Sequence, residues 1–522
     1  MDFIALLLTP FIYTNLTKSF LSIYQQQYYK TSRYIDCLIK KIDKKCLFKN
    51  LMIILGYSIL TLCFIYFFKI PTYLIFLYTL ITLMLLSTQK DNIIPLKYTN
   101  RIKRSYLTFY SLSLIVLLVF YYSFNKSNYI YLLFNIILLL CLSVIVSIVM
   151  ILLSPIEYRI KKKYALKAKV TLLENKKLKT IGITGSYGKT STKNILNTIL
   201  SSKYSTLATP KSYNTPMGIS NCVNNEKMYL YDYFIAELGI DEVKGMDKLL
   251  DIVQPDYAII TSIGPMHLKT LKSIDKITNE KMKLATFVSH DGFIVLNNDN
   301  RYIREFDKAK LKGKVITVGI DNDADIMAKN IVYTSTGSSF DVVTNNNTFN
   351  VTLPLLAKHN ITNALCAIAL SINLGVDIEK IKISLSSIKQ VPHRLETNRK
   401  NNHLFIDDSY NSNYEGFSNA LDVLSSFHDK RILITPGLIE LGKYNREYNY
   451  KIAEKIVKSC DEVILVKNKS SMHIKERIRE LSTMSIVEVD SFFDATRYIK
   501  KEYDDDNAVI LIENDLPDNY LN

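Results

Sequence analysis

The chain has 522 residues, 48% of them hydrophobic, with 65 Lys+Arg against 49 Asp+Glu, and this length predicts two to four domains. The formal net charge of +16 lies wholly in residues 1–170, which hold 21 Lys+Arg and 5 Asp+Glu, so the rest of the chain is neutral. That distribution argues against a nucleic-acid-binding protein, in which basic residues cover one face of a folded domain. The seven cysteines show no CxxC pair and no metal-ligand spacing, which argues against a disulfide framework or a structural zinc site and fits a reducing compartment.

The first third contains apolar segments of about the length that crosses a membrane. Four of them are residues 51–68, 72–87, 106–124 and 129–153. About 20 helical residues at 1.5 Å each cross the roughly 30 Å hydrocarbon core of a bilayer, and tilt or thinning accommodates the short second segment. A fifth segment, residues 3–23, contains Asn15 and Lys18 and either spans the bilayer or lies in its interface. It lacks the features of a removable signal peptide.

The loops between these segments alternate in charge. Residues 30–49, 90–104 and 159–169 are basic, whereas the tips at residues 69–71 and 125–128 hold one lysine each. Under the positive-inside rule the basic loops are cytoplasmic, so we expect everything after Ser154 to lie in the cytoplasm. The spans contain few ionisable residues, which favours an anchor over an ion pathway. The alternative is a soluble helical bundle whose connections are basic by chance.

From residue 179 onward, short apolar runs alternate with helical stretches. Strands are predicted at residues 180–183, 233–236, 257–261, 293–296 and 315–318, and helices at 194–200, 246–252 and 274–287. This alternation predicts an α/β fold with a largely parallel, doubly wound sheet. A second α/β set begins near His403, with strands at 404–406, 431–435 and 462–466. We therefore predict a transmembrane helical region (1–170), a P-loop central domain (171–396) and a smaller Rossmann-like C-terminal domain (397–522).

The strongest chemical signal is a glycine-rich loop at a predicted strand–helix junction, Gly182-Ile-Thr-Gly-Ser-Tyr-Gly-Lys-Thr-Ser-Thr-Lys193. Glycines let backbone N–H groups approach phosphate oxygens, and the helix N-terminus adds partial positive charge. Lys189 is expected to reach the β and γ phosphates and the Thr190 hydroxyl to hold Mg²⁺. Five residues separate Gly182 from Gly188, one more than the standard loop allows. A glycine-rich turn without a ligand is the alternative.

The extra residue in this loop is informative, because the pattern G-x-T-G-x-x-G-K-T resembles that of the Mur ligase family. This family comprises ATP-dependent ligases that build cell-wall peptides, together with folylpolyglutamate synthases. Further matches follow in the family's order, over about two-thirds of the chain: Ser212-Tyr-Asn-Thr-Pro-Met-Gly218, Ala236-Glu-Leu-Gly239, Ile263-Gly-Pro-Met-His267, His359-Asn-Ile-Thr-Asn363, His393-Arg394 and Asp407-Asp-Ser-Tyr-Asn-Ser-Asn413. The last motif, with Pro436-Gly-Leu-Ile-Glu-Leu-Gly442, most resembles the branch that adds D-alanyl-D-alanine. The resemblance implies an amide-forming ligase that uses ATP and Mg²⁺ and passes through an acyl phosphate.

The resemblance also assigns roles to single residues. Nucleotide binding falls to Gly185, Ser186, Gly188, Lys189, Thr190, Ser191, Asn363 at the adenine, Arg394 at the phosphates and Asp408 at the ribose. Mg²⁺ binding falls to Thr190, Glu237, His267 and Lys281. The catalytic set is Lys189, His267, Lys281 and Arg394. Substrate contacts are expected from Tyr213, Asn214, Thr215, Tyr410, Asn411 and Asn413. Each of these roles has a purely structural alternative. Glu237 is then a paired core residue, His267 a hydrogen-bonded core residue, the lysines of residues 274–287 are solvated, and residues 410–413 form a polar turn after a strand.

Lys281 is carbamylated in several family members, and the resulting anion holds a second Mg²⁺. That chemistry requires a neutral amine, and therefore a depressed lysine pKa. The family often has glutamate two residues later, where this chain has Lys283, so the local charge balance departs from the family pattern.

The N-terminal third also departs from the family. Soluble Mur ligases have a domain there that binds the uridine diphosphate of the precursor, whereas this chain has apolar segments and basic loops. The expected partners are a bilayer, a cell-wall peptide precursor and an amino acid or dipeptide, with no nucleic acid. The acceptor is a UDP-sugar peptide, a lipid-linked precursor or another wall precursor, as for an archaeal pseudomurein ligase. A P-loop-powered transporter and a catalytically weak membrane scaffold are the alternatives from other classes.

Overall fold

The computed structural model of the chain describes residues 10, 14–15, 17–27, 29, 31, 33–35, 96–123, 142–211, 213–266, 268–390, 393–409, 414–439, 441, 444–503 and 507–514. The chain divides into two compact units, residues 1–163 and 164–522. The domain boundaries predicted after residues 170 and 396 remain predictions.

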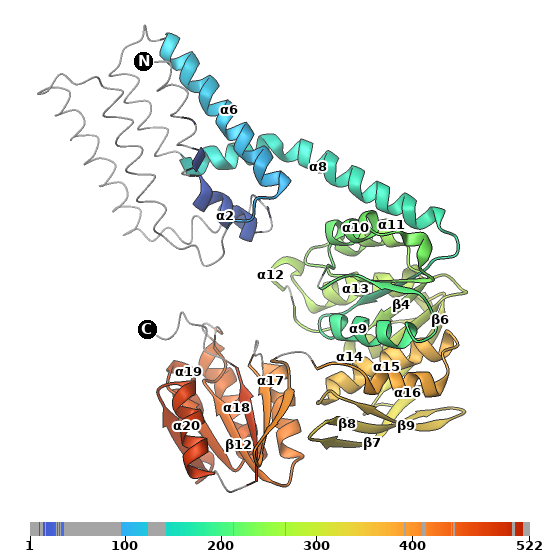
Figure 1. The fold of residues 1–522 in the computed structure, drawn as a ribbon, viewed down its shortest axis with the longest axis vertical. Helices are drawn as coiled ribbons and strands as arrows, with labels where there is room; N and C mark the ends of the chain where they lie inside the picture. The colour runs from blue at the N-terminus through green and yellow to red at the C-terminus, as the bar shows by residue number, and fades with distance from the viewer. Residues whose placement is uncertain are drawn as a thin grey trace, which may run out of the picture. The chain divides into compact units, whose positions relative to one another are not determined.

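The described part of the first unit is helical: α2 (Lys18–Gln26), α6 (Asn100–Ser123) and the beginning of α8 (Leu142–Glu174) (Figure 1). Helix α6 covers the predicted segment 106–124 up to Ser123, and α8 covers the second half of the segment 129–153. The predicted segments 51–68 and 72–87 lie outside the described residues, as does much of 3–23. Among the described residues, one stretch, Asn100–Val119, is long and apolar enough to cross a membrane.

The second unit begins with the last part of α8, which a nine-stranded sheet follows in the order β2-β3-β1-β4-β5-β6-β7-β8-β9. Neighbouring strands from β2 to β7 run parallel, and β7, β8 and β9 pair antiparallel. The strands are β1 (Lys179–Thr184), β2 (Thr206–Ala208), β3 (Tyr233–Glu237), β4 (Tyr257–Ile260), β5 (Phe293–Asn297), β6 (Lys314–Gly319), β7 (Ile326–Thr334), β8 (Gly337–Thr344) and β9 (Thr348–Leu353). All five predicted strands are confirmed, whereas β2 and the antiparallel extension were not predicted.

Helices cover both faces of this sheet, because alternate strand residues are apolar on each side. Ile181 and Ile183 of β1 pack on the face covered by α9 (Lys189–Leu200), α15 (Lys358–Asn373) and α16 (Ile378–Ser386). Ala236 of β3 and Ile260 of β4 pack on the other face, against α10 (Pro216–Asn225), α11 (Gly245–Val253) and α13 (Ile274–Phe287) (Figure 1). Short helices complete the region: η1 (Met228–Leu230), α12 (Leu268–Leu271), α14 (Arg301–Arg304) and η2 (Lys308–Lys310). The doubly wound arrangement is confirmed.

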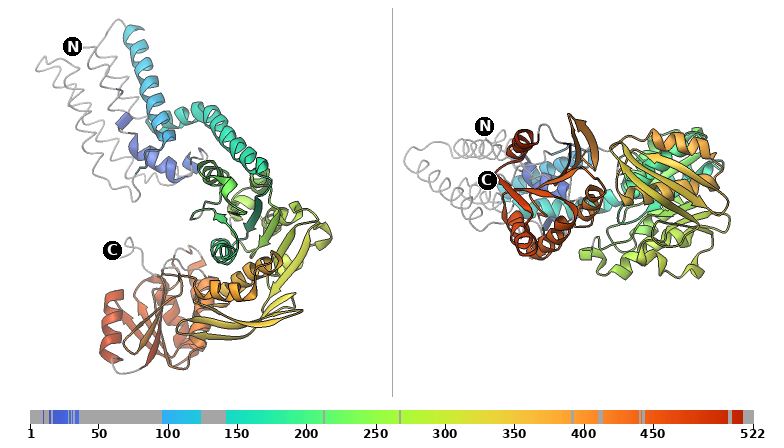
Figure 2. Two further views of the ribbon diagram at one scale, coloured as in Figure 1. Left: turned by 45° about the vertical axis from the view of Figure 1, so that its right-hand side comes forward. Right: turned by 90° about the horizontal axis from the view of Figure 1, so that it is seen from below.

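A second sheet follows in the order β10-β11-β15-β12-β13-β14, parallel except for β10. Its elements are β10 (Glu396–Lys400), β11 (His403–Asp408), α17 (Tyr414–Ser425), β12 (Lys430–Thr435), α18 (Asn445–Ser459), β13 (Glu462–Val466), α19 (Lys469–Leu481), β14 (Ser485–Val489), α20 (Phe492–Glu502) and β15 (Ala508–Glu513). Leu433 and Val463 face a core with α17, α18 and α19, whereas Ile432 and Ile464 face a core with α20. The strands therefore lie between two helical layers (Figure 2).

Candidate active site

The glycine-rich loop joins the carboxyl end of β1 to the beginning of α9. Gly188 has φ +80°, a left-handed conformation that favours glycine, and α9 begins at Lys189, five residues before the predicted start. The loop is tied to the end of β4: the Ser186 backbone N–H donates to the Ser262 carbonyl at 2.5 Å, and Thr261 Oγ1 donates to the Tyr187 carbonyl at 2.6 Å. The amide-rich turn is therefore held in shape by its neighbouring strand.

Two of these glycines are needed because other side chains approach the loop closely. A Cβ on Gly185 would lie 2.0 Å from Thr261 Oγ1, and one on Gly188 would lie 2.3 Å from Asn363 Oδ1. Within the described part of the chain, the side-chain nitrogen of Asn363 is buried and has no hydrogen-bond partner. A buried donor without an acceptor is unfavourable, and here it lies beside the phosphate loop, where a nucleotide would supply an acceptor.

Lys189, Thr190 and Glu237 meet at the mouth of the loop. Lys189 Nζ donates to the Gly185 and Ser186 carbonyls at 2.8 and 3.1 Å, and burial lowers its pKa while Glu237 opposes that shift. Thr190 Oγ1 donates to Glu237 Oε2 at 2.9 Å, and Glu237 is 1% exposed. A hydroxyl beside a buried carboxylate provides hard oxygen ligands suited to Mg²⁺. Ser191 follows in the same first turn of α9.

Lys281 reaches the same loop from α13. Its amine donates to the Gly185 carbonyl at 2.8 Å, and the side chain is buried. Burial, and then the charge of Lys189, lower the pKa of Lys281 to about 7. Lys283 instead forms ion pairs with Asp247 and Glu280, both at 2.7 Å. Its charge is thus compensated on another side of the helix, and the departure from the family pattern does not leave an extra cation beside Lys281.

The segment predicted to contact substrate lies against Glu237. Asn214 donates from its side-chain amide to Glu237 Oε1 at 3.1 Å, and its carbonyl accepts from the Gly239 N–H at 2.9 Å. Thr215 caps α10, accepting from the Gly218 N–H at 3.2 Å, and the Tyr213 side chain is exposed. Asn214 therefore joins the site directly, whereas Thr215 shapes the turn.

Arg394 and Asp408 belong to a second group of residues, at the beginning of the second sheet. Asp408, the last residue of β11, accepts from the Leu395 N–H at 3.2 Å, and Arg394 is exposed. Burial raises the pKa of Asp408 to about 6, although its hydrogen bond with the Glu513 side chain, the Leu395 N–H and the charge of Arg394 act in the opposite direction. Four predicted site residues, His267, Tyr410, Asn411 and Asn413, lie outside the described residues, as does Ser212.

Sequence reasoning missed Lys193, which follows Lys189 by one helical turn. Its ammonium group contacts Glu237 Oε2 at 3.3 Å, and both side chains are 1% exposed. Its spacing from Lys189 could have indicated this position, because residues four apart lie on the same face of a helix. A lysine near a helix N-terminus usually points to solvent, however, so the spacing alone did not single it out.

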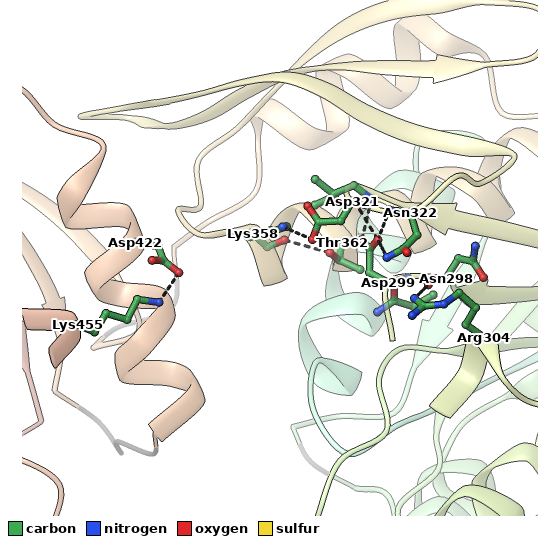
Figure 3. Close-up of polar contacts among 11 residues, drawn as sticks. Asn298, Asp299, Arg304, Asp321, Asn322, Lys358, Thr362, Asp422 and Lys455 are labelled. Atoms are coloured by element: carbon green, nitrogen blue, oxygen red, sulfur yellow. Dashed lines mark hydrogen bonds and ion pairs between the residues drawn. The ribbon is translucent and has the colours of Figure 1, made fainter. Parts of the chain in front are cut away.

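It also missed Asp299, which follows β5. The Asp299 carboxylate accepts from the backbone N–H groups of Ile320, Asp321 and Asn322 at 2.7–3.0 Å, and Lys358 at the beginning of α15 pairs with Asp321 (Figure 3). We call Asp299 and the amides of residues 320–322 the β5–β6 latch. It joins the carboxyl ends of these two strands beside the helix that carries Asn363.

The comparisons with known proteins agree with this geometry. Residues 183–371 match the model of the Mur ligase middle domain, and residues 393–512 match that of the Mur ligase glutamate ligase domain. The chain belongs to the Mur ligase family. This confirms the resemblance drawn from its motifs.

The similar relatives are named UDP-N-acetylmuramoyl-tripeptide–D-alanyl-D-alanine ligases. The protein of Buchnera aphidicola subsp. Baizongia pistaciae is 32% identical over 281 residues, and that of Escherichia coli strain K12 is 30% identical over 278. Each match covers 53% of this chain and 61% of the relative. The chain thus matches about three-fifths of the length of these relatives.

Solved structures give the same fold. A crystal structure of MurF from Acinetobacter baumannii has a TM-score of 0.59 at 25% identity, covering 68% of this chain and 77% of that one. The MurF ligase of Thermotoga maritima in complex with ADP has a TM-score of 0.58 at 23% identity, covering 68% and 80%. The Mur ligase fold of residues 164–522 is therefore supported by family models and by architecture.

Proposed function

We propose that this Mur ligase is a membrane-anchored, ATP- and Mg²⁺-dependent carboxylate–amine ligase that adds D-alanyl-D-alanine to a UDP-N-acetylmuramoyl-tripeptide. One observation carries the proposal: the Thr190 hydroxyl and the buried Glu237 carboxylate meet at 2.9 Å beside a glycine loop that also receives Lys189 and Lys281. The names of the relatives supply the choice of acceptor and dipeptide.

The proposed chemistry transfers the γ-phosphoryl group of ATP to the acceptor carboxylate and then lets an amine displace phosphate. Catalysis of this kind depends on alignment and on neutralising crowded anions. The loop N–H groups and Lys189 would bind the phosphates, and Asn363 would bind the base. Arg394 and Asp408 would supply a cation and a ribose contact from the second sheet.

The residues also fit a divalent metal ion. Thr190, Glu237 and a carbamylated Lys281 would present oxygen atoms, and the family resemblance adds an imidazole nitrogen from His267. A bound Mg²⁺ would neutralise phosphate charge and lower the barrier to transfer. The low pKa of Lys281 supports carbamylation, because the neutral amine is the form that reacts with CO₂.

The membrane part of the proposal rests on the surface of the N-terminal helices. On α8, the exposed side chains Val144, Ile148, Ile151, Leu152 and Ile156 form an apolar stripe at helical spacing. Leu107, Ile115 and Val119 are likewise exposed on α6. Apolar residues on the outside suit a lipid environment, where backbone groups are paired within helices. We propose a multi-pass location in the cytoplasmic membrane, with the ligase domains in the cytoplasm.

The first test is phosphate release by the full-length protein in detergent with ATP, Mg²⁺, UDP-N-acetylmuramoyl-tripeptide and D-alanyl-D-alanine. We expect release that depends on the dipeptide, and a Lys189→Ala variant should lose at least about 10²–10³-fold in rate, as when a charge-stabilising donor is removed. Lys312→Ala, which removes an exposed lysine, serves as the matched control. A Lys189→Ala variant with full activity would contradict the assigned site.

The same assay separates the remaining functions. Dipeptide-independent ATP turnover would favour a transporter, and no turnover with any precursor would favour a scaffold. If the UDP-linked acceptor fails, lipid-linked precursors and pseudomurein peptides are the next substrates. Mass spectrometry of the products identifies which precursor gained an amide.

A further inference from the structure

Lys193 is a buried cation for which the proposed chemistry has no direct use. It lies one turn after Lys189 on α9 and is 1% exposed. All three N–H bonds of its ammonium group have acceptors: the Thr209 carbonyl at 2.8 Å, the Lys211 carbonyl at 2.5 Å and Glu237 Oε2 at 3.3 Å. Burying an ammonium group is unfavourable unless it is paired in this way, so this side chain is specifically accommodated.

Two of the three hydrogen-bond acceptors of Lys193, the Thr209 and Lys211 carbonyls, lie in the segment that leads to the residues expected to contact substrate. We call the described residues 209–211 and 213–214 the acceptor segment, after the acceptor substrate that Tyr213 and Asn214 are expected to contact. Thr209 donates its backbone N–H to the Ile235 carbonyl at 3.0 Å, and Thr209 Oγ1 accepts from the Glu237 N–H at 3.2 Å. At the other end, Asn214 donates to Glu237 Oε1. The segment is therefore attached to Glu237 at both ends.

The two carboxylate oxygens of Glu237 have different partners. Oε2 accepts from Thr190 and Lys193, and Oε1 accepts from Asn214. These contacts fix the rotation of the carboxylate, with one oxygen toward the phosphate loop and one toward the acceptor segment. Hydrogen-bonded neighbours that orient a metal ligand in this way commonly govern metal affinity.

The backbone of the acceptor segment also depends on Lys193. Lys211 has φ +48°, a left-handed conformation that a non-glycine side chain adopts at an energetic cost. Its carbonyl accepts the shortest of the three Lys193 bonds. Loss of that hydrogen bond would remove a contact that stabilises the left-handed conformation of Lys211.

We propose that Lys193 is a positioning residue that holds both the Glu237 carboxylate and the acceptor segment in place. Binding of the metal ion and binding of the acceptor substrate then both depend on this one buried ammonium group. This inference rests on the proposed function. It predicts that loss of Lys193 weakens both kinds of binding at once.

The experiment measures equilibrium binding of a fluorescent, non-hydrolysable ATP analogue to the full-length protein while Mg²⁺ is titrated. In Lys193→Met, which keeps the length of the chain without its charge, the half-saturating Mg²⁺ concentration should rise roughly 10–100-fold, as for other residues that orient metal ligands. Lys203→Met is the control, because Lys203 donates to the Gly375 carbonyl and is remote from Glu237. Thermal unfolding in EDTA establishes that each variant is folded.

A second measurement tests the coupling. Asn214→Ala also acts through Glu237, so its effect on the Mg²⁺ requirement should be less than additive with Lys193→Met. The KM for UDP-N-acetylmuramoyl-tripeptide should rise in both variants. A merely structural lysine would lower the unfolding temperature and leave the Mg²⁺ requirement of the folded fraction unchanged.

The outcomes are distinguishable from failure of the proposed function. Wild-type protein that binds no nucleotide would refute the function. Wild-type protein that binds it, with an unchanged or lower Mg²⁺ requirement in Lys193→Met, would overturn the role of Lys193. If Lys193→Met does not fold, Lys193→Arg takes its place: it keeps the charge but cannot repeat three contacts in the same buried space, so its Mg²⁺ requirement should also rise, and an unchanged value overturns the inference.

Discussion

At the scale of single residues, the site places three lysine side chains around one buried carboxylate. Lys189, Lys193 and Lys281 gather around Glu237 and the Gly185 carbonyl. Within the described part of the chain, Lys281 forms no ion pair with a carboxylate; it donates to the Gly185 carbonyl, and burial and the charge of Lys189 lower its pKa to about 7. Because burial penalises the charged form, this amine is the one best prepared to react with CO₂.

The low pKa leads to a pH-dependent prediction. As pH rises from about 6 to about 8, through the pKa of Lys281, the fraction of neutral amine grows, and carbamylation should grow with it. In ¹³C-bicarbonate, the ¹³C NMR carbamate signal should therefore increase over this range. Lys281→Arg should remove the signal, and Lys283→Arg should keep it. A wild-type protein without a carbamate signal at the higher pH would contradict the prediction.

At the scale of elements, the ends of strands carry the site. The loop after β1 binds the end of β4, Glu237 ends β3, and the β5–β6 latch joins the next two strands. These strands are parallel, so their carboxyl ends meet at one edge of the sheet. Residues distant in the sequence become neighbours there, and each is held by hydrogen bonds to the next strand.

The latch can be tested directly. Asp299→Ala leaves the N–H groups of residues 320–322 without their acceptor, so the free energy of unfolding of the central region should fall by about 1–3 kcal/mol. Water reaches this partly exposed site and limits the loss. Differential scanning fluorimetry measures the change, and Asp323→Ala, at an exposed neighbouring position, is the control. Equal unfolding temperatures for the two variants would show that the latch contributes no stability.

At the scale of the whole molecule, the chain combines two units of different composition. The last part of α8 belongs to the second unit, where Ala168 and Leu172 pack against the central core. Most of the basic surplus and the apolar helical stripes lie before Tyr164. This division separates the proposed anchor from the ligase domains.

A chain that begins at Tyr164 keeps the contacts of Ala168 and Leu172. We expect it to remain in solution without detergent and to bind the ATP analogue, whereas the full-length protein should stay in the membrane pellet after alkaline extraction. Ultracentrifugation followed by immunoblotting distinguishes the two. Full-length protein in the alkaline supernatant would argue against a spanning anchor.

The sequence by itself determined the family and the central strands, and it pointed to Lys189, Thr190, Glu237 and Lys281, which the structure brings to one loop. Glycines, a lysine and a threonine at set spacing encode a local loop, and buried parallel strands appear as continuous apolar runs such as residues 257–260. Short-range patterns of this kind do not depend on distant parts of the chain.

Only the tertiary structure decided how those residues act on one another. The antiparallel strands β7 to β9 mix buried residues with exposed or half-exposed ones, so no continuous apolar run marked them. The sequence likewise left the surroundings of Lys193, Lys281 and Asp299 open, because their partners are distant in sequence. Glu237 lies 44 residues from Lys193, Gly185 lies 96 residues from Lys281, and the N–H groups bound by Asp299 lie 21–23 residues further along the chain. A side chain's pKa and its contacts are properties of that packed environment, which the fold assembles from separate segments.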